Sequence, residues 1–92
     1  MKFEWDQEKN LINQKKHKIS FETAAYVFQD KNYIEMYDFE HSTEEDRYIA
    51  IGCVGEVLFV VFTERKENIR LISARVATES ERRLYYDQNI YY

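Results

Sequence analysis

Three arginines stand at the ends of two apolar segments, where their side chains could bind an anion. Arg65 follows the apolar run 57–62, and Arg70 and Arg75 lie towards the two ends of residues 69–75. Arginine carries a permanent positive charge on a planar guanidinium, and this geometry suits paired hydrogen bonds to a phosphate. The first hypothesis for this chain is therefore a surface that binds phosphate groups.

A histidine and further cations near the start of the chain could complete such a surface. Lys9 and Lys16 share one flank of a predicted helix with Asn13, and His17 follows directly. The same cations could instead only complement the C-terminal dipole of that helix, and the sequence leaves both interpretations open. The candidate substrate-binding residues are Lys9, Lys16, Thr63 and Arg70.

RNA cleavage without a metal ion needs little more than such a set of groups. The 2′-hydroxyl attacks the adjacent phosphate, so the protein has to align that attack and stabilise the charge that develops on the phosphate oxygens. Arg65 and Arg75 are the predicted catalytic residues for the second task. His17 or Glu64 could assist proton transfer, and His17 is retained as the third catalytic candidate although the sequence does not decide between them.

Motifs for other common chemistries are missing from the sequence. It lacks a Ser-His-Asp arrangement, a glycine-rich phosphate loop and a recognised metal-ligand spacing, so we expect neither a metal nor a cofactor. The single cysteine, Cys53, predicts a reducing compartment, which we take to be the cytoplasm. No apolar run is long enough to cross a membrane, and the charged first residues predict no signal peptide.

The net charge of −4 does not decide whether the ligand is a nucleic acid. Residues 35–46 hold six acids and no lysine or arginine, which leaves 13 basic and 11 acidic residues in the rest of the chain. Local potential, and not the total charge, steers an anionic ligand. We expect residues 38–46 to form an acidic loop away from the arginines, with His41 as a solvated loop residue.

The predicted helices and strands indicate one α+β domain over residues 1–92. The order is β-α-α-β-β-β-β-α, with two N-terminal helices packed on an antiparallel sheet of four to five strands and a helix at the C-terminal end. The predicted elements are a strand at 2–5, helices at 7–16 and 21–29, strands at 33–37, 47–53, 57–62 and 69–75, and a helix at 79–89.

Side-chain periodicity indicates which faces of these elements are buried. Phe21, Ala24, Ala25 and Phe28 form an amphipathic stripe that predicts a core-facing helix, whereas the first helix offers the core only Leu11 and Ile12. In an ideal strand Arg70 and Arg75 point to opposite faces, because they are five positions apart. One phosphate can therefore meet both only if the strand ends or bulges near Ala74.

A set of short motifs follows in a specific order along the chain. It consists of Trp5-Asp6, Lys9, Asn13, Lys16-His17, Ser20-Phe21-Glu22, Ala25, Arg47 to Gly52, Phe62 to Arg65 and Arg70 to Arg75. With these motifs the chain resembles the BrnT family of toxins from type II toxin–antitoxin systems. The resemblance covers the chain to about Tyr85, and the sequence departs from the family at Lys18, where glycine commonly follows Lys-His, and in residues 87–92.

The resemblance implies a RelE-like fold and a ribonuclease activity that arrests translation. It also implies neutralisation by a BrnA-like antitoxin with a ribbon-helix-helix part, in a heterotetramer or larger complex. Such a complex would repress its own operon, and the toxin would touch operator DNA only through the antitoxin. We expect RNA and this antitoxin as partners, and no membrane.

Two other classes of function stay open on the sequence. The arginines could serve a non-catalytic interaction module that binds an acidic partner. The chain could also be a transcriptional corepressor that acts only through a DNA-binding partner. Incubation of the protein with single-stranded RNA separates the ribonuclease from both alternatives.

Overall fold

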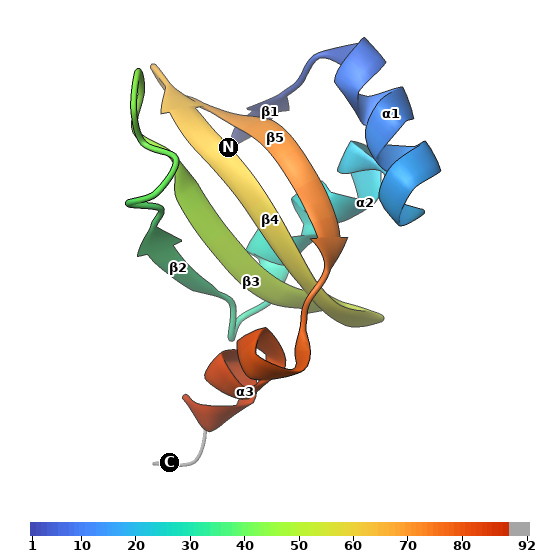
Figure 1. Cartoon of the computed structure of the whole chain (residues 1–92), viewed down its shortest axis with the longest axis vertical. Coiled ribbons are helices and arrows are strands. Elements are labelled where there is room, and N and C mark those ends of the chain that lie inside the picture. The colour runs from blue at the N-terminus through green and yellow to red at the C-terminus, as the bar shows by residue number, and fades with distance from the viewer. Residues whose placement is uncertain (89–92) are drawn as a thin grey trace.

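The computed structural model describes residues 1–88, and its elements follow the predicted order (Figure 1). The predicted second helix is a short α-helix followed by a 3-10 helix, and the C-terminal helix ends earlier than predicted, while residues 89–92 lie outside the described part. The elements are β1 (Lys2–Glu4), α1 (Gln7–His17), α2 (Phe21–Ala24), η1 (Ala25–Gln29), β2 (Ile34–Tyr37), β3 (Tyr48–Val54), β4 (Glu56–Arg65), β5 (Asn68–Val76) and α3 (Glu79–Asp87).

The strands form one sheet in the order β1-β5-β4-β3-β2, which confirms the predicted α+β class. Strands β2 to β5 pair antiparallel, as expected. The exception is β1, which runs parallel to β5. No hairpin joins β1 to β5, so no tight turn forces their directions to alternate. Patterns within short stretches of sequence therefore could not show this pairing.

A β-bulge in β5 changes which arginines share a face. The register between β4 and β5 shifts between Val61 and Phe62, and Ile72 is left as the extra residue on β5. Side-chain alternation resets at a bulge, so Arg70 and Arg75 point to the same face of the sheet. From the sequence, the two arginines could share a face only if the strand ended or bulged near Ala74. The bulge at Ile72 meets this condition.

The two faces of the sheet differ in what covers them. In Figure 1, α2 and η1 lie behind the sheet, α1 lies beside the edge formed by β1 and β5, and α3 lies at one end of the sheet. The main core beneath the N-terminal helices consists of Ile19, Phe21, Ala24, Val27, Ala50, Leu58, Val60, Phe62, Ile69, Leu71 and Ala74. A smaller cluster near α3 consists of Ile51, Val57, Ala77 and Tyr85.

We call the side away from α1 and α2 the open face. Alternation along β4 and β5 places a mixture of apolar, hydroxyl and arginine side chains there. The open face is defined by Phe59, Val61, Thr63 and Arg65 on β4 and by Arg70, Ser73 and Arg75 on β5.

Helix α1 packs on the sheet through asparagines and not through its apolar residues. The Asn13 side chain donates to the Ala74 carbonyl at 2.9 Å and accepts from the Ala74 N–H at 3.1 Å. Asn10 is fully buried and accepts from the Phe21 N–H at 2.8 Å. An amide satisfies both polar groups of a free strand edge, and these would be costly to bury without partners.

The expectation that Leu11 and Ile12 face the core was therefore wrong. Their exposed fractions are 56% and 60%. Beyond Arg70, β5 has no strand partner on its β1 side, so a polar side chain and not a leucine is needed there. Each α-helix is capped at its start by a side chain, with Asp6 before α1, Ser20 before α2 and a complete capping box at the start of α3.

Candidate functional site

The loop between β2 and β3, residues 38–47, closes on itself at one end of the sheet. The Asp38 N–H donates to the Arg47 carbonyl at 2.9 Å, and the Ser42 hydroxyl donates to the Asp38 carbonyl at 2.6 Å. The Arg47 N–H in turn donates to the Ser42 hydroxyl at 2.8 Å. These bonds replace the strand pairing that ends at β2 and β3, so the loop has a fixed base.

Thr63 ties this loop to the open face. Its hydroxyl donates to the Asp46 carbonyl at 2.6 Å, and the residue is only 2% exposed. The structure thus places Thr63, which we predicted to bind substrate, beneath the loop as a support. Because Thr63 and Arg65 alternate onto the same face, the loop lies next to Arg65. The expectation that the acidic loop stands away from the arginines was therefore wrong for Arg65.

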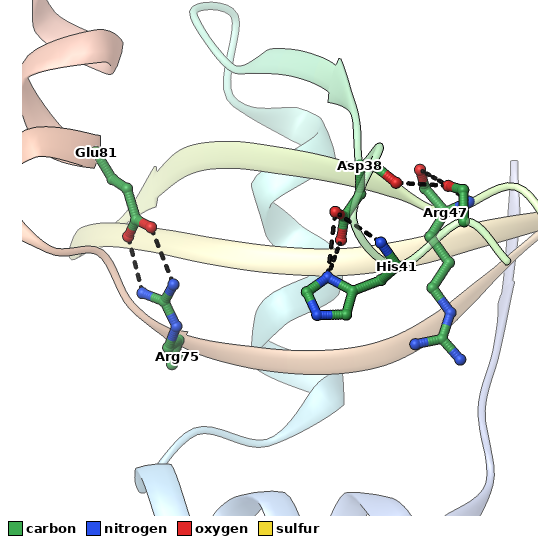
Figure 2. Close-up of polar contacts among 6 residues, drawn as sticks. Asp38, His41, Arg47, Arg75 and Glu81 are labelled. Carbon is green, nitrogen blue, oxygen red and sulfur yellow. Dashed lines mark hydrogen bonds and ion pairs between the residues drawn. The ribbon is translucent and has the colours of Figure 1, made fainter.

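Within the loop, His41 is oriented by a buried carboxylate. Its Nδ1 lies 3.0 Å from Asp38 Oδ2 and 3.2 Å from Oδ1, as Figure 2 shows. The side chain of Asp38 is 10% exposed and that of His41 is 63% exposed. A neutral imidazole with Nδ1–H donating to the carboxylate presents Nε2 as a proton acceptor. The pair therefore has the arrangement of an oriented general base.

Two arginines stand beside this pair around a common pocket. The pocket has a volume of about 330 Å³ and is open to solvent. Arg65 has one contact to Glu45 at 3.5 Å, where both side chains are well exposed, and such a pair is weak and screened by salt. The pocket is lined by His41, Thr43, Glu44, Glu45, Arg47 and Arg65.

Arg47 is the less compensated of the two arginines. Its backbone closes the loop, while its guanidinium forms no ion pair or hydrogen bond with any residue that the structure describes. In Figure 2 the Arg47 side chain extends away from the loop without a dashed contact at its guanidinium. The positive charge at this end of the sheet is therefore available to an anion.

Arg75 lies at the other end of the open face and is already paired. Its two terminal nitrogens donate to Glu81 at 2.8 and 2.9 Å, and its guanidinium stacks over the Phe59 ring at 4.0 Å. The hydrogen bonds that Arg75 donates to Glu81 raise the pKa of Arg75, and the same bonds hold the pKa of Glu81 below its usual range. Figure 2 shows this pair beside α3.

Helix α3 is held to the sheet from a second side as well. The Tyr85 hydroxyl donates to Asp30, and the same carboxylate accepts the Cys53 N–H at 2.7 Å. Burial, together with the hydrogen bond to Asp30, raises the pKa of Tyr85. Arg75, Glu81 and Tyr85 therefore act together in fixing α3 over the end of the sheet.

The remaining strand arginine, Arg70, is paired with Glu4 of β1 at 2.8 Å. Hydrogen bonds from Asn68 and then Arg70 lower the pKa of Glu4. Arg70 shares a face with Arg75, but Arg65 stands six positions beyond Phe59, the residue opposite Arg75. At about 3.3 Å per residue this separation is roughly 20 Å. The structure does not bring Arg65 and Arg75 to one phosphate.

The candidates on the first helix lie at the opposite edge of the sheet from the loop. Lys9 and Lys16 are exposed on α1, and His17 is half-buried at its last turn. In Figure 1, α1 flanks the β1 and β5 edge, whereas loop 38–47 joins the strands of the other edge. Lys18 ends the helix with φ 63°, a left-handed conformation that favours glycine. This conformation explains why glycine is common at this position in the family that the sequence resembles.

Sequence reasoning thus missed three residues of the site, namely Asp38, His41 and Arg47. The available signal was the spacing Asp-x-x-His, which lets the carboxylate reach the imidazole within one turn. The number of acids around His41 concealed it, since a charged loop is usually only solvated. Within residues 1–88, no cluster of three or more His, Cys, Asp or Glu side chains could hold a metal ion, and no helix is long and apolar enough to cross a membrane.

Comparison with known proteins gives one family. Residues 5–81 match the family model described as the ribonuclease toxin BrnT of type II toxin–antitoxin systems. No curated protein matches the chain at a significant level. The matched range includes loop 38–47, the three strand arginines and the capping box of α3.

Proposed function

Because the chain belongs to the BrnT family of ribonuclease toxins, we propose that it cleaves RNA in the pocket beside loop 38–47 without a metal ion. The observation that carries this proposal is the Asp38–His41 pair next to Arg47 and Arg65. The pocket combines an oriented proton acceptor with two loosely held cations, and this combination is what transesterification of RNA requires.

In the proposed reaction, His41 acts as the general base. Its Nε2 takes the proton of the 2′-hydroxyl, and the 2′-oxygen attacks the adjacent phosphorus. The bond from phosphorus to the 5′-oxygen breaks, and this oxygen leaves with a proton from water. The products are a 2′,3′-cyclic phosphate and a free 5′-hydroxyl. No redox partner or further reactant is needed.

The other pocket residues have supporting roles in this proposal. Asp38 holds the imidazole in the tautomer that leaves Nε2 free and stabilises the imidazolium after proton transfer. Arg47 and Arg65 stabilise the additional negative charge on the phosphate oxygens in the transition state. Glu45 next to Arg65 is displaced from that weak contact when a phosphate enters.

A type II system pairs its toxin with a protein antitoxin. We propose that this antitoxin is BrnA-like, carries a ribbon-helix-helix part, and forms a heterotetramer or larger complex with the toxin. Cleavage of cellular RNA by the free toxin would arrest translation, and the complex would repress its operon through the antitoxin. A stoichiometric amount of antitoxin should therefore abolish RNA cleavage.

The test is an assay of the purified protein on single-stranded RNA with and without EDTA. We expect cleavage in both conditions and 2′,3′-cyclic phosphate ends. The control substrate carries 2′-deoxyribose at the cleaved nucleotide and should stay intact. Loss of activity in EDTA, restored by a divalent ion, would contradict the metal-free mechanism. A folded protein that binds RNA or an acidic protein but never cleaves RNA would favour a non-catalytic interaction module.

A further inference from the structure

Helix α1 exposes an apolar surface that the fold itself does not use. We call it the outer face of α1 and define it by Glu8, Leu11, Ile12, Lys15 and Lys18. Together with Gln14, these residues line a shallow hollow of about 640 Å³. Leu11 and Ile12 are the two apolar residues of this lining, and they are 56% and 60% exposed.

A single exposed leucine is common on protein surfaces and needs no explanation. Here, however, two large apolar residues adjoin each other on a helix that is anchored by buried Asn10 and Asn13. Core packing therefore does not account for Leu11 or Ile12. Contiguous apolar residues at a hollow with a polar rim are typical of a protein-binding surface.

The charge around this surface indicates the chemistry of its partner. Lys15 and Lys18 border the apolar centre, and Lys9 and Lys16 follow on the adjacent flank of the helix. No lysine in residues 1–88 forms an ion pair with another described residue. A complementary partner would carry apolar side chains flanked by acids.

We propose that the outer face of α1 binds an amphipathic helical segment of the protein antitoxin, with apolar residues over Leu11 and Ile12 and acids near Lys15 and Lys18. The inference rests on the toxin function only for the existence of the antitoxin. A helix in a hollow is a common way to bury such anchors.

Two other occupants fit this surface less well. A second copy of the chain would place lysine-rich faces against each other, and like charges across an interface oppose association. Single-stranded RNA is usually held by cations together with aromatic side chains on which bases stack, and the outer face of α1 has no aromatic residue. The antitoxin is therefore the occupant that the chemistry favours.

The position of this surface makes the proposal separable from catalysis. The outer face of α1 lies beyond β5 and β1, whereas the pocket of loop 38–47 lies at the edge formed by β2 and β3. A substitution on α1 should thus change antitoxin affinity and leave the RNA cleavage rate of the free toxin unchanged.

The decisive variant is Leu11→Asp, and Leu84→Asp is the matched control. Leu84 is an exposed leucine on α3, with an exposed fraction of 52%. We expect Leu11→Asp to weaken binding of the antitoxin encoded beside the toxin gene by about tenfold to a hundredfold, as for loss of an interface anchor. Leu84→Asp should bind like the wild type. Leu11→Ala keeps a strong helix former and should weaken binding severalfold if Leu11→Asp does not fold.

The charge part of the proposal is tested with Lys15→Glu and with Lys31→Glu as its control, since Lys31 is an exposed lysine outside α1. Only Lys15→Glu should weaken antitoxin binding, and raising the salt concentration should reduce the difference. In cells, Leu11→Asp should remain toxic when the antitoxin is co-expressed at a level that protects against the wild type.

Three results would overturn the docking proposal. One is wild-type antitoxin affinity in both Leu11→Asp and Leu11→Ala. Another is loss of RNA cleavage in a folded Leu11→Asp protein, which would make the face part of the RNA site. The third is a concentration-dependent dimer of the free toxin that Leu11→Asp abolishes, which would identify a second copy as the occupant. If the wild type binds antitoxin through this face but does not cleave RNA, the proposed function fails and the docking site stands.

Discussion

The two ends of the open face hold arginines in different electrostatic states. At the α3 end, Arg75 makes two short hydrogen bonds to Glu81 and lies over Phe59. At the loop end, Arg65 has one exposed contact at 3.5 Å, and Arg47 has no charged partner among the described residues. An arginine that is paired with a carboxylate must break that ion pair before it can bind a ligand. An arginine without a charged partner does not have this cost.

Whether an arginine is already paired within the fold indicates its role more reliably than its residue type does. By sequence, Arg65 and Arg75 look equivalent, since each ends an apolar segment. Their roles diverge because Glu81 returns from α3 to one of them, and the loop with His41 folds beside the other. We therefore propose that the α3 end holds the fold together and that the loop end carries out catalysis.

The largest effect is expected at the histidine of the loop end. His41→Gln removes titration but keeps a hydrogen-bonding group, so the cleavage rate should fall by about 10²–10⁴-fold, the usual contribution of general acid–base catalysis. The measurement is the single-turnover rate on RNA, with the melting temperature recorded in parallel. His17→Gln is the control, because His17 lies on α1, and its rate should stay close to the wild type. The reverse result would restore His17 as the proton acceptor.

A smaller effect is expected when the orienting carboxylate is changed. Asp38→Asn allows the opposite tautomer of His41, so the rate should fall on the order of tenfold to a hundredfold, less than with a fully enclosed pair because water reaches the exposed ring. Glu44→Gln is the control, as Glu44 is an exposed acid of the same loop. Equal rates for Asp38→Asn and the wild type would remove Asp38 from the mechanism.

The smallest effect concerns stability at the α3 end and its dependence on pH. Arg75 lowers the pKa of Glu81 below its ordinary value of 4.5. The ionised pair therefore stabilises the fold above that value, and the contribution is lost as the pH falls through the lower folded-state pKa. A partly exposed charged pair contributes about 1 kcal/mol, which corresponds to about 4–8 °C in a domain of this size.

The variant for this prediction is Glu81→Gln, with melting temperatures measured from neutral pH down to the unfolding limit. Its stability should be lower than that of the wild type above pH 4.5, and the difference should shrink at lower pH. Glu79→Gln serves as the control, because the Glu79–Arg83 pair is highly exposed and contributes little. A constant difference at every pH would show that the ion pair is not the cause.

Much of the fold could be predicted because its signals are local. Asp6, Ser20 and Thr78 cap the helices that follow them, and the side chains that cap a helix lie within a few residues of its start. The turn between β3 and β4 also rests on a local feature, because Gly55 has φ 76°, a conformation that favours glycine. The BrnT family was also recognisable from the order of short motifs along the chain.

The placement of the site could not be predicted, because the contacts that bring loop 38–47 beside Arg65 join distant segments, although the Asp38–His41 contact itself is local. Nothing near Asn13 in the sequence shows that its amide pairs with Ala74, and nothing near Thr63 shows that it supports Asp46. The bulge was anticipated as a condition, but its place at Ile72 follows from pairing with β4. Residue types alone therefore identified the arginines as candidates. They did not show which arginines are paired with a carboxylate in the folded protein.

The RNA cleavage rates of Arg47→Ala and Arg75→Ala test whether catalysis takes place at the loop end and not at the α3 end. Both are measured under single-turnover conditions, at a temperature at which both variants are folded. We expect Arg47→Ala to lose about 10²–10³ in rate at an unchanged melting temperature, as for loss of one preorganised charged donor. Arg47→Lys should recover only part of this loss. Arg75→Ala should melt several degrees lower, by roughly the amount expected for about 1 kcal/mol, and cleave RNA close to the wild-type rate.

Two results would contradict catalysis at the loop end. One is a folded Arg75→Ala protein that loses as much activity as Arg47→Ala. The other is an Arg47→Ala protein with wild-type activity.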